Sequence, residues 1–339
     1  MVVLSQPIID SLDQIKTCKP ISNIFAEIPV VDLSDSNARS LIVSACKEFG
    51  FFKVIKYQGI SMELVNKLES EAVNFFKLTQ QEKEKYGPPN PFGYGNKKIG
   101  PNGDVGWVEY LLFCTNPQII SQNSNANFPG ISENLRVLVK EYVSAVRNMT
   151  CEVLEMIADE LQIWPRDALS KLIRDEKSDS CFRLNHYPAP SPAGPHNLIG
   201  FGEHTDPQII SVVRSNNTSG LQICLKDGTT WVSVPPDHTS FFFNVGDSLQ
   251  VMTNGRFKSV KHRVMADSMK SRVSMIYFGG PPLNKKITPL SSLMEKDEES
   301  LFKEFTWCEY KKSAYKTRLG DNRLGLFEKS AAQFLVHGI

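Results

Sequence analysis

The seven cysteines of the sequence are scattered, and no two of them form a Cys-x-x-Cys pair. Their odd number and wide spacing argue against a disulfide framework, and the lack of close pairs argues against a structural zinc site. Unpaired thiols are typical of a reducing compartment. The cysteine pattern therefore predicts a cytoplasmic protein.

Long apolar runs and a charge excess are also missing. No apolar run approaches the ~20 residues that cross a membrane, and the first residues lack the basic end and long apolar core of a signal peptide. The 38 basic and 37 acidic residues give a net charge of +1, which indicates neither a nucleic-acid nor an acidic-membrane partner. We expect a soluble protein that binds neither.

What is present is a globular composition with alternating strand and helix patterns in the first half. The chain has 339 residues, of which 41% are hydrophobic and 22% charged, enough to bury a large core. Apolar patterns predict strands over 28–33 and 50–55 around a helix over 37–49, and a long helix over 133–161. The glycine-rich stretch 92–106 reads as an irregular loop.

The second half, from residue 182, has short apolar segments separated by turn residues at regular intervals. This rhythm is typical of a β-sandwich or jelly roll. Beyond residue 282 the strand pattern ends, and the charged and aromatic segment 298–315 predicts a helix that packs over the core.

A metal-binding pattern lies within this half. His204 and Asp206 are two residues apart, so on a strand both side chains point to one face. His262 follows far enough along the chain to come from another strand. Two imidazoles and one carboxylate suit the Fe(II) site of a non-haem oxygenase. A zinc hydrolase could use the same ligands, but the sequence has no His-Glu-x-x-His helix.

A candidate anion clamp follows ten residues later. Arg272 and Ser274 alternate on an apolar run that predicts a buried strand. A buried arginine needs an anion, and a guanidinium fork beside a hydroxyl can hold a carboxylate. With a metal holding the other end, the pattern fits 2-oxoglutarate. On the earlier strand 182–187, the side chains of Arg183, Asn185 and Tyr187 share one face.

These residues and their neighbours carry a resemblance to a known family. The stretches 200–220, 245–262 and 274–282 resemble the plant Fe(II)- and 2-oxoglutarate-dependent dioxygenases, and within them the gibberellin 2-oxidases (gibberellin 2-beta-dioxygenases) of the C19-gibberellin type. The likeness extends over roughly residues 28–328.

The resemblance implies an α+β fold with a double-stranded β-helix (jelly-roll) core and flanking helices. It implies a flexible N-terminus (1–26), a mixed helical region (27–177), the jelly-roll core (178–282) and a helical C-terminal extension (283–339). It also implies Fe(II) on His204, Asp206 and His262, and 2-oxoglutarate held by Arg272 and Ser274 with help from Tyr187 and Asn185. O2 is the further cosubstrate, and ascorbate is expected to support activity.

The implied reaction is hydroxylation of C19 gibberellins or their precursors at carbon 2, which inactivates the hormone and releases succinate and CO2. Tyr94, Lys97, Trp107 and Tyr110 fall where the family's substrate pocket is expected, although ordinary packing or a solvated charge would also explain each of them. Two alternatives stay open: a plant dioxygenase that acts on another metabolite such as a flavonoid, and a non-catalytic binding protein on the same scaffold. The sequence leaves an oligomer open.

Overall fold

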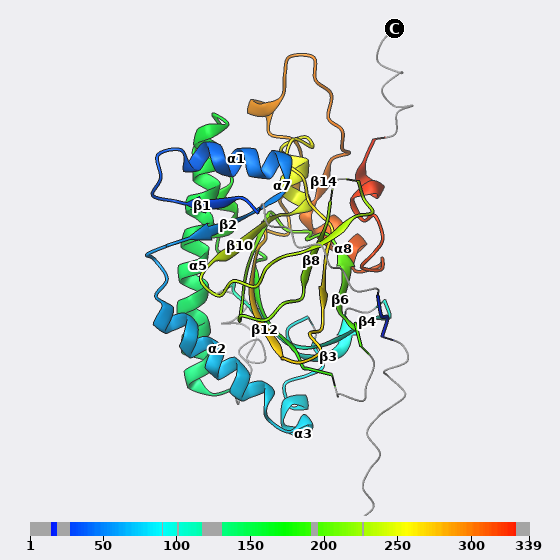
Figure 1. Ribbon diagram of the computed structural model, residues 1–339. Helices are drawn as coiled ribbons and strands as arrows, with labels where there is room; N and C mark the ends of the chain where they lie inside the picture. The colour runs from blue at the N-terminus through cyan, green and yellow to red at the C-terminus, as the bar shows by residue number, and fades with distance from the viewer. Residues whose placement is uncertain are drawn as a thin grey trace, which may run out of the picture.

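Two large β-sheets, a two-stranded sheet and a layer of helices make up the described part of the computed structural model (Figure 1). It describes residues 15–18, 28–89, 91–99, 102–116, 131–190, 196–225 and 227–329. The N-terminal segment that we expected to be flexible lies almost entirely outside these residues. No helix of the described part is long and apolar enough to cross a membrane.

The larger sheet has eight strands, and only its β1–β2 pair is parallel. Its order is β1 (Val30–Asp32), β2 (Phe51–Ile55), β10 (Phe241–Val245), β7 (Ile210–Ser215), β12 (Arg272–Gly279), β5 (Cys181–Tyr187), β4 (Asp104–Cys114) and β3 (Gly93–Ile99). The smaller sheet is antiparallel and has the order β6 (Ile199–His204), β11 (His262–Met265), β8 (Leu221–Cys224) and β9 (Trp231–Ser233). These two largely antiparallel sheets with their flanking helices confirm the predicted α+β jelly-roll class.

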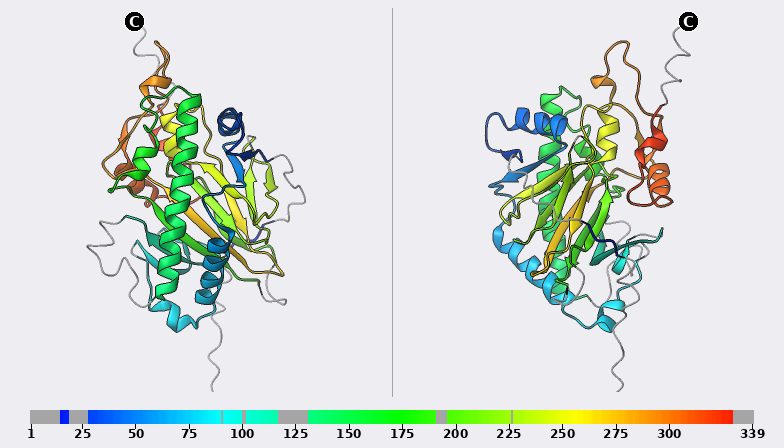
Figure 2. Two further views of the ribbon diagram at one scale, coloured as in Figure 1. Left: turned by 90° about the vertical axis from the view of Figure 1, so that its left-hand side faces the viewer. Right: turned by 45° about the vertical axis from the view of Figure 1, so that its right-hand side comes forward.

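Helices cover the outer face of the larger sheet (Figure 2). They are α1 (Ala38–Glu48), α2 (Met62–Phe76) and the long α5 (Glu133–Glu160). The α1 and α5 helices confirm those predicted over 37–49 and 133–161. The α5 helix begins where the Ser132 hydroxyl accepts a hydrogen bond from the Leu135 amide. Its apolar stripe packs on β12 and β7. This helical layer closes one face of β12 and β5 and leaves the other face for the site.

The prediction of an irregular loop over 92–106 is wrong. Most of the segment forms the β3–β4 hairpin, with a register shift between Asn96 and Lys98. Gly95 is required within β3 because a Cβ atom there would lie 2.3 Å from Cζ of the Tyr110 ring. Glycine thus makes room for an aromatic side chain on the neighbouring strand and does not interrupt the ladder.

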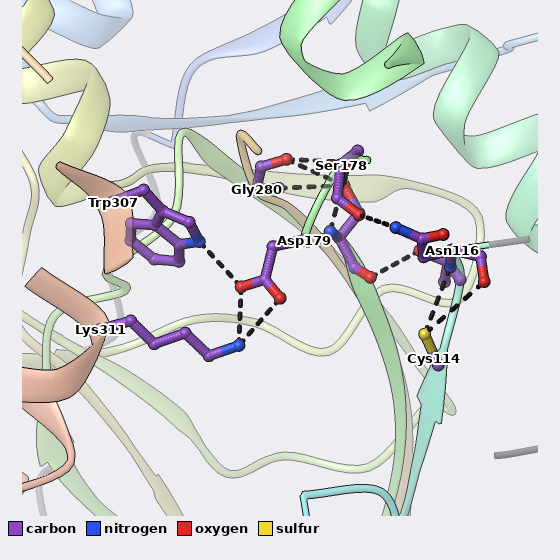
Figure 3. Close-up of polar contacts among 9 residues, drawn as sticks. Cys114, Asn116, Ser178, Asp179, Gly280, Trp307 and Lys311 are labelled. Carbon is purple, nitrogen blue, oxygen red and sulfur yellow. Dashed lines mark hydrogen bonds and ion pairs between the residues drawn. The ribbon is translucent and has the colours of Figure 1, made fainter. Parts of the chain in front are cut away.

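The predicted C-terminal helix is shorter than expected. It is α8 (Trp307–Ala314), preceded by β14 (Phe305–Thr306), which pairs with β13 (Lys286–Ile287). Asp179 fastens α8 to the start of β5: its carboxylate accepts hydrogen bonds from Trp307 Nε1 at 2.8 Å and Lys311 Nζ at 2.7 Å (Figure 3). The remaining short elements are α3 (Gln80–Glu84), α6 (Ser170–Arg174), α7 (Asp247–Met252) and two 3-10 turns, η3 (Ser291–Leu293) and η4 (Leu324–Phe327).

The region before residue 178 and the region after it contribute to one sheet. Strands β1 to β4 come from the first region, and they extend the sheet that β5, β7, β10 and β12 form. The division of the chain into four regions stays a prediction.

Candidate active site

The first and last residues of two neighbouring strands bring the predicted metal ligands together. His204 ends β6, His262 begins β11, and the two residues pair directly across the antiparallel ladder. Asp206 lies beyond the end of β6 and not on the strand itself, so the expectation that one strand carries both His204 and Asp206 is wrong. The side chains nevertheless converge: one ligand atom from each residue lies within 4.8 Å of the others. The Asp206 Oδ1 atom is 3.6 Å from His204 Nε2 and 3.8 Å from His262 Nε2.

Hydrogen bonds hold both imidazoles in the orientation that a metal site needs. His204 Nδ1 donates to the Gly202 carbonyl at 2.8 Å, and His262 Nδ1 donates to the Val260 carbonyl at 3.3 Å. Each ring therefore presents Nε2 to the centre. Burial, with a contribution from His262, holds the pKa of His204 well below its usual range, so its ring stays neutral and able to bind a cation.

Asp206 is held from the side opposite to the imidazoles. It is buried, and its Oδ2 accepts a hydrogen bond from the Ser211 hydroxyl on β7. Its Oδ1 is the atom that faces His204 and His262. The three side chains thus offer a mixed nitrogen and oxygen face, which is the donor set of mononuclear non-haem Fe(II) sites.

The predicted anion clamp lies in the same pocket. Arg272 and Ser274 on β12 are only 2% and 1% exposed, yet Arg272 Nε, Arg272 Nη1 and Ser274 Oγ have no hydrogen-bond partner among the described residues. Leaving such atoms without a partner is costly. An anionic ligand would satisfy them, and a carboxylate matches the guanidinium fork. These side chains fit one carboxylate of 2-oxoglutarate.

The neighbouring strand supplies the two further cosubstrate candidates. Tyr187 pairs with Arg272, and Asn185 pairs with Ser274. The Arg272 guanidinium lies 5.4 Å from the centre of the Tyr187 ring. Asn185 Nδ2 donates to the Tyr187 hydroxyl at 3.0 Å, which orients that ring. The structure therefore brings all four candidates to one end of the pocket.

Apolar side chains from both sheets form the rest of the pocket wall. The sequence analysis did not predict these residues. Strand alternation could have indicated some of them, because Ile276 and Phe278 share a face with Ser274, and Val264 shares one with His262. The complete apolar set is Phe201, Val213, Leu221, Val264, Ile276 and Phe278. The pocket therefore suits a largely apolar molecule held close to the metal-ligand set.

The four substrate candidates take different positions. The Tyr110 ring stacks on the guanidinium of Arg183, a residue of the pocket wall, at 3.8 Å. Tyr94 is directed to the helix-covered face of the sheet, where its hydroxyl donates to Glu109 Oε2 at 2.7 Å. Lys97 Nζ lies 5.5 Å from the Trp107 ring, and Trp107 Nε1 donates to the Pro188 carbonyl. Of the four, only Tyr110 contacts a residue of the pocket wall in these interactions.

Comparison with protein families gives two matches. Residues 178–281 match the 2OG-Fe(II) oxygenase superfamily, and residues 28–130 match a family described as the N-terminal region of the non-haem dioxygenases in morphine synthesis. The first match contains His204, Asp206, His262, Arg272 and Ser274.

Comparison with individual proteins gives relatives over nearly the full length. The chain is 63% identical to gibberellin 2-beta-dioxygenase of Phaseolus coccineus over 98% of this chain and 100% of the relative. It is 60% identical to gibberellin 2-beta-dioxygenase 2 of Arabidopsis thaliana over 97% of each chain. Among solved structures, it is similar to JOX2 in complex with 2OG, Fe and JA, with a TM-score of 0.81, 27% identity and 94% of each chain covered.

Proposed function

The chain belongs to the gibberellin 2-beta-dioxygenases of the 2OG-Fe(II) oxygenase superfamily, and we propose that it hydroxylates gibberellins at carbon 2. As a member of this family it is an Fe(II)- and 2-oxoglutarate-dependent dioxygenase. The observation that carries the proposed substrate is the 63% identity over 337 residues to a curated gibberellin 2-beta-dioxygenase.

His204, Asp206 and His262 bind Fe(II) in this proposal. Arg272 and Ser274 hold the far carboxylate of 2-oxoglutarate, while Tyr187, oriented by Asn185, packs beside them. When bound, the iron, 2-oxoglutarate and O2 together supply the oxidising power for C–H hydroxylation, with succinate and CO2 as the other products. The unpartnered atoms of Arg272 and Ser274 support this assignment.

The chain itself contributes position, charge and exclusion of water. Arg272 fixes the direction in which the cosubstrate points, because its planar fork binds two carboxylate oxygens at once. The apolar wall formed by Phe201, Leu221, Val264 and Ile276 holds the substrate skeleton. Orienting one C–H bond toward the metal is the part of catalysis that the protein supplies.

The finer parts of the proposal concern the substrate range and the compartment. We infer that C19 gibberellins and their precursors are the substrates and that hydroxylation inactivates the hormone. All seven cysteines are free thiols, which supports the cytoplasm as the compartment.

Product analysis by mass spectrometry tests the proposal. The purified protein is incubated with Fe(II), ascorbate, 2-oxoglutarate and a panel of gibberellins, with one flavonoid for comparison. We expect C19 gibberellins hydroxylated at carbon 2 and one succinate for each product. Hydroxylation of the flavonoid with no gibberellin product would keep the dioxygenase chemistry and contradict the proposed substrate.

A further inference from the structure

A second arginine, Arg183, lines the metal pocket together with Arg272. On the β5–β12 ladder, Arg272 pairs with Tyr187 and Arg183 pairs with Ile276, four residues further along. That spacing separates the two positions by about 13 Å along the strands. The two arginines therefore stand at two different places of one pocket.

The Arg183 guanidinium is held firmly but is only partly hydrogen-bonded. It lies 3.8 Å from the centre of the Tyr110 ring and 5.0 Å from that of the Phe201 ring. Its Nε donates to Asn185 Oδ1 at 2.7 Å, whereas Nη2 is buried with no hydrogen-bond partner among the described residues. The rings fix the plane of the group, and Nη2 is left to donate to a ligand.

Other arginines with unpartnered buried nitrogen atoms do not share this setting. Arg214 pairs with Met275 on the helix-covered face of the sheet. The charge of Arg323, in the C-terminal segment, contributes to lowering the pKa of His204, but Arg323 does not line the metal pocket. Among the residues that line the metal pocket, Arg183 and Arg272 are the two arginines. Because Arg183 lines the pocket, a molecule bound there can reach its guanidinium group.

The charges of the loaded site leave Arg183 without a counterion. Fe(II) and Arg272 bring three positive charges, and Asp206 with the two carboxylates of 2-oxoglutarate brings three negative charges. In the proposed arrangement both cosubstrate carboxylates already have partners, one at the metal and one at Arg272. The positive charge of Arg183 remains, and a charge removed from water is costly without an anion.

We propose that Arg183 binds the carboxylate of the substrate, so that the pocket selects apolar monocarboxylic acids over their neutral derivatives. This inference rests on the proposed function and assigns the residue that reads the acid group of the gibberellin. The substrate lies with its apolar skeleton against Phe201, Val264 and Ile276 and its acid group at Arg183 Nη2. Tyr110 acts as a positioning residue that supports the guanidinium from one side.

The test compares a C19 gibberellin with its carboxyl methyl ester in wild type and Arg183→Met. Binding is measured by calorimetry without oxygen, in the presence of Fe(II) and 2-oxoglutarate, so the comparison does not depend on turnover. In wild type the acid should bind more tightly than the ester. The Arg183→Met variant should weaken binding of the acid about 30-fold or more and leave binding of the ester nearly unchanged.

Two further variants make the result specific. Arg263→Met is the matched control. Like Arg183, Arg263 stacks on an aromatic ring, Trp231 at 4.1 Å, and donates its Nε to an amide oxygen, that of Gln222, but it does not line the metal pocket. It should bind the acid as wild type does. Arg183→Lys keeps a positive charge and should recover part of the preference for the acid.

Three results would overturn the inference. The first is equal binding of acid and ester by wild type. The second is equal weakening of both by Arg183→Met. The third is a loss of 2-oxoglutarate affinity in that variant with the preference for the acid intact, which would make Arg183 a support for Asn185 and the cosubstrate. Tight acid binding through Arg183 without hydroxylation at carbon 2 would instead sustain the inference and contradict the proposed function.

Discussion

Two clusters of buried polar side chains lie on opposite faces of the β4–β5–β12 sheet. They differ in whether their polar atoms have hydrogen-bond partners. On the helix-covered face, the Glu109 carboxylate accepts hydrogen bonds from Lys83 Nζ at 2.6 Å, Tyr94 Oη at 2.7 Å and His186 Nδ1 at 2.8 Å. On the pocket face, Arg272 and Ser274 keep donor atoms that no described residue satisfies.

This difference distinguishes polar side chains that stabilise the fold from polar side chains that bind a ligand. Burial would raise the pKa of Glu109, but the hydrogen bonds from His186 and Lys83 outweigh it and hold that pKa below its usual range. The network around Glu109 is therefore complete, and it contributes to the fold. Arg214, on the same helix-covered face, does keep buried nitrogen atoms without a partner among the described residues. The unpartnered atoms of Arg272 and Ser274 differ in that these residues line a pocket together with His204, Asp206 and His262, where a ligand can satisfy them. Since both clusters consist of buried polar residues, the residue types alone do not distinguish the structural cluster from the ligand-binding one.

The largest effect is expected at the metal-ligand set. His204→Ala removes a ligand nitrogen, and losing the metal's contribution of several kcal/mol should lower turnover more than about a thousandfold. Succinate release and the iron content of the purified variant are the measurements. Activity near the wild-type level with unchanged iron content would refute the assignment of His204.

Arg272→Ala should act on the cosubstrate and spare the metal. Deleting one partner of a buried charge pair costs about 3 kcal/mol, so the KM for 2-oxoglutarate should rise about a hundredfold. Iron binding should stay intact, because Arg272 contacts none of the three metal candidates in the structure. An unchanged KM for 2-oxoglutarate would show that the clamp is assigned wrongly.

Glu109→Ala should give the opposite pattern. It leaves the buried Lys83 ammonium without its partner, which should lower the free energy of unfolding by about 3 kcal/mol. Denaturant unfolding measures this effect, and 2-oxoglutarate affinity of the folded fraction should be unchanged. Glu109→Gln, which keeps the shape and part of the hydrogen bonding, is the control and should lose less. Normal stability with weakened 2-oxoglutarate binding in Glu109→Ala would contradict the structural role of Glu109.

Asp179→Asn should have the smallest effect. It weakens the links from Trp307 and Lys311 that fasten α8 to the core, and Lys311 is partly exposed. A loss of about 1 kcal/mol is expected, visible as a lower unfolding midpoint with unchanged turnover at low temperature. Lys311→Met should reproduce part of this loss, and no loss in either variant would show that the contact is unimportant.

The sequence predicted the parts of the site that depend on short-range spacing. The Arg272 and Ser274 alternation and the long helix over 133–161 follow from local periodicity. The convergence of His204, Asp206 and His262 also depends on how β6 pairs with β11. The positions of Tyr94 and Tyr110 do not, because their direction depends on how β3 pairs with β4. Since a one-residue slip reverses every side chain, the register shift near Lys97 could not be placed from sequence.

Arg183 illustrates a second limit of the sequence. Strand alternation predicted that it shares a face with Asn185 and Tyr187, and the ladder agrees. Its missing hydrogen-bond partner is a property of the assembled pocket, since it depends on Tyr110, Phe201 and Asn185 together. The sequence could place the Arg183 side chain on one face of β5. It could not show that Arg183 Nη2 has no hydrogen-bond partner among the described residues.

We expect the pocket lined by the metal-ligand set, Arg272 and Ser274 to bind Fe(II) and 2-oxoglutarate. The most direct test uses calorimetry. Metal-free wild-type protein is titrated in the absence of oxygen, first with Fe(II) and then with 2-oxoglutarate. We expect one iron per chain, lost in Asp206→Ala, and one 2-oxoglutarate that binds much more tightly once iron is present. Iron binding that survives Asp206→Ala, or 2-oxoglutarate binding that ignores iron, would contradict it.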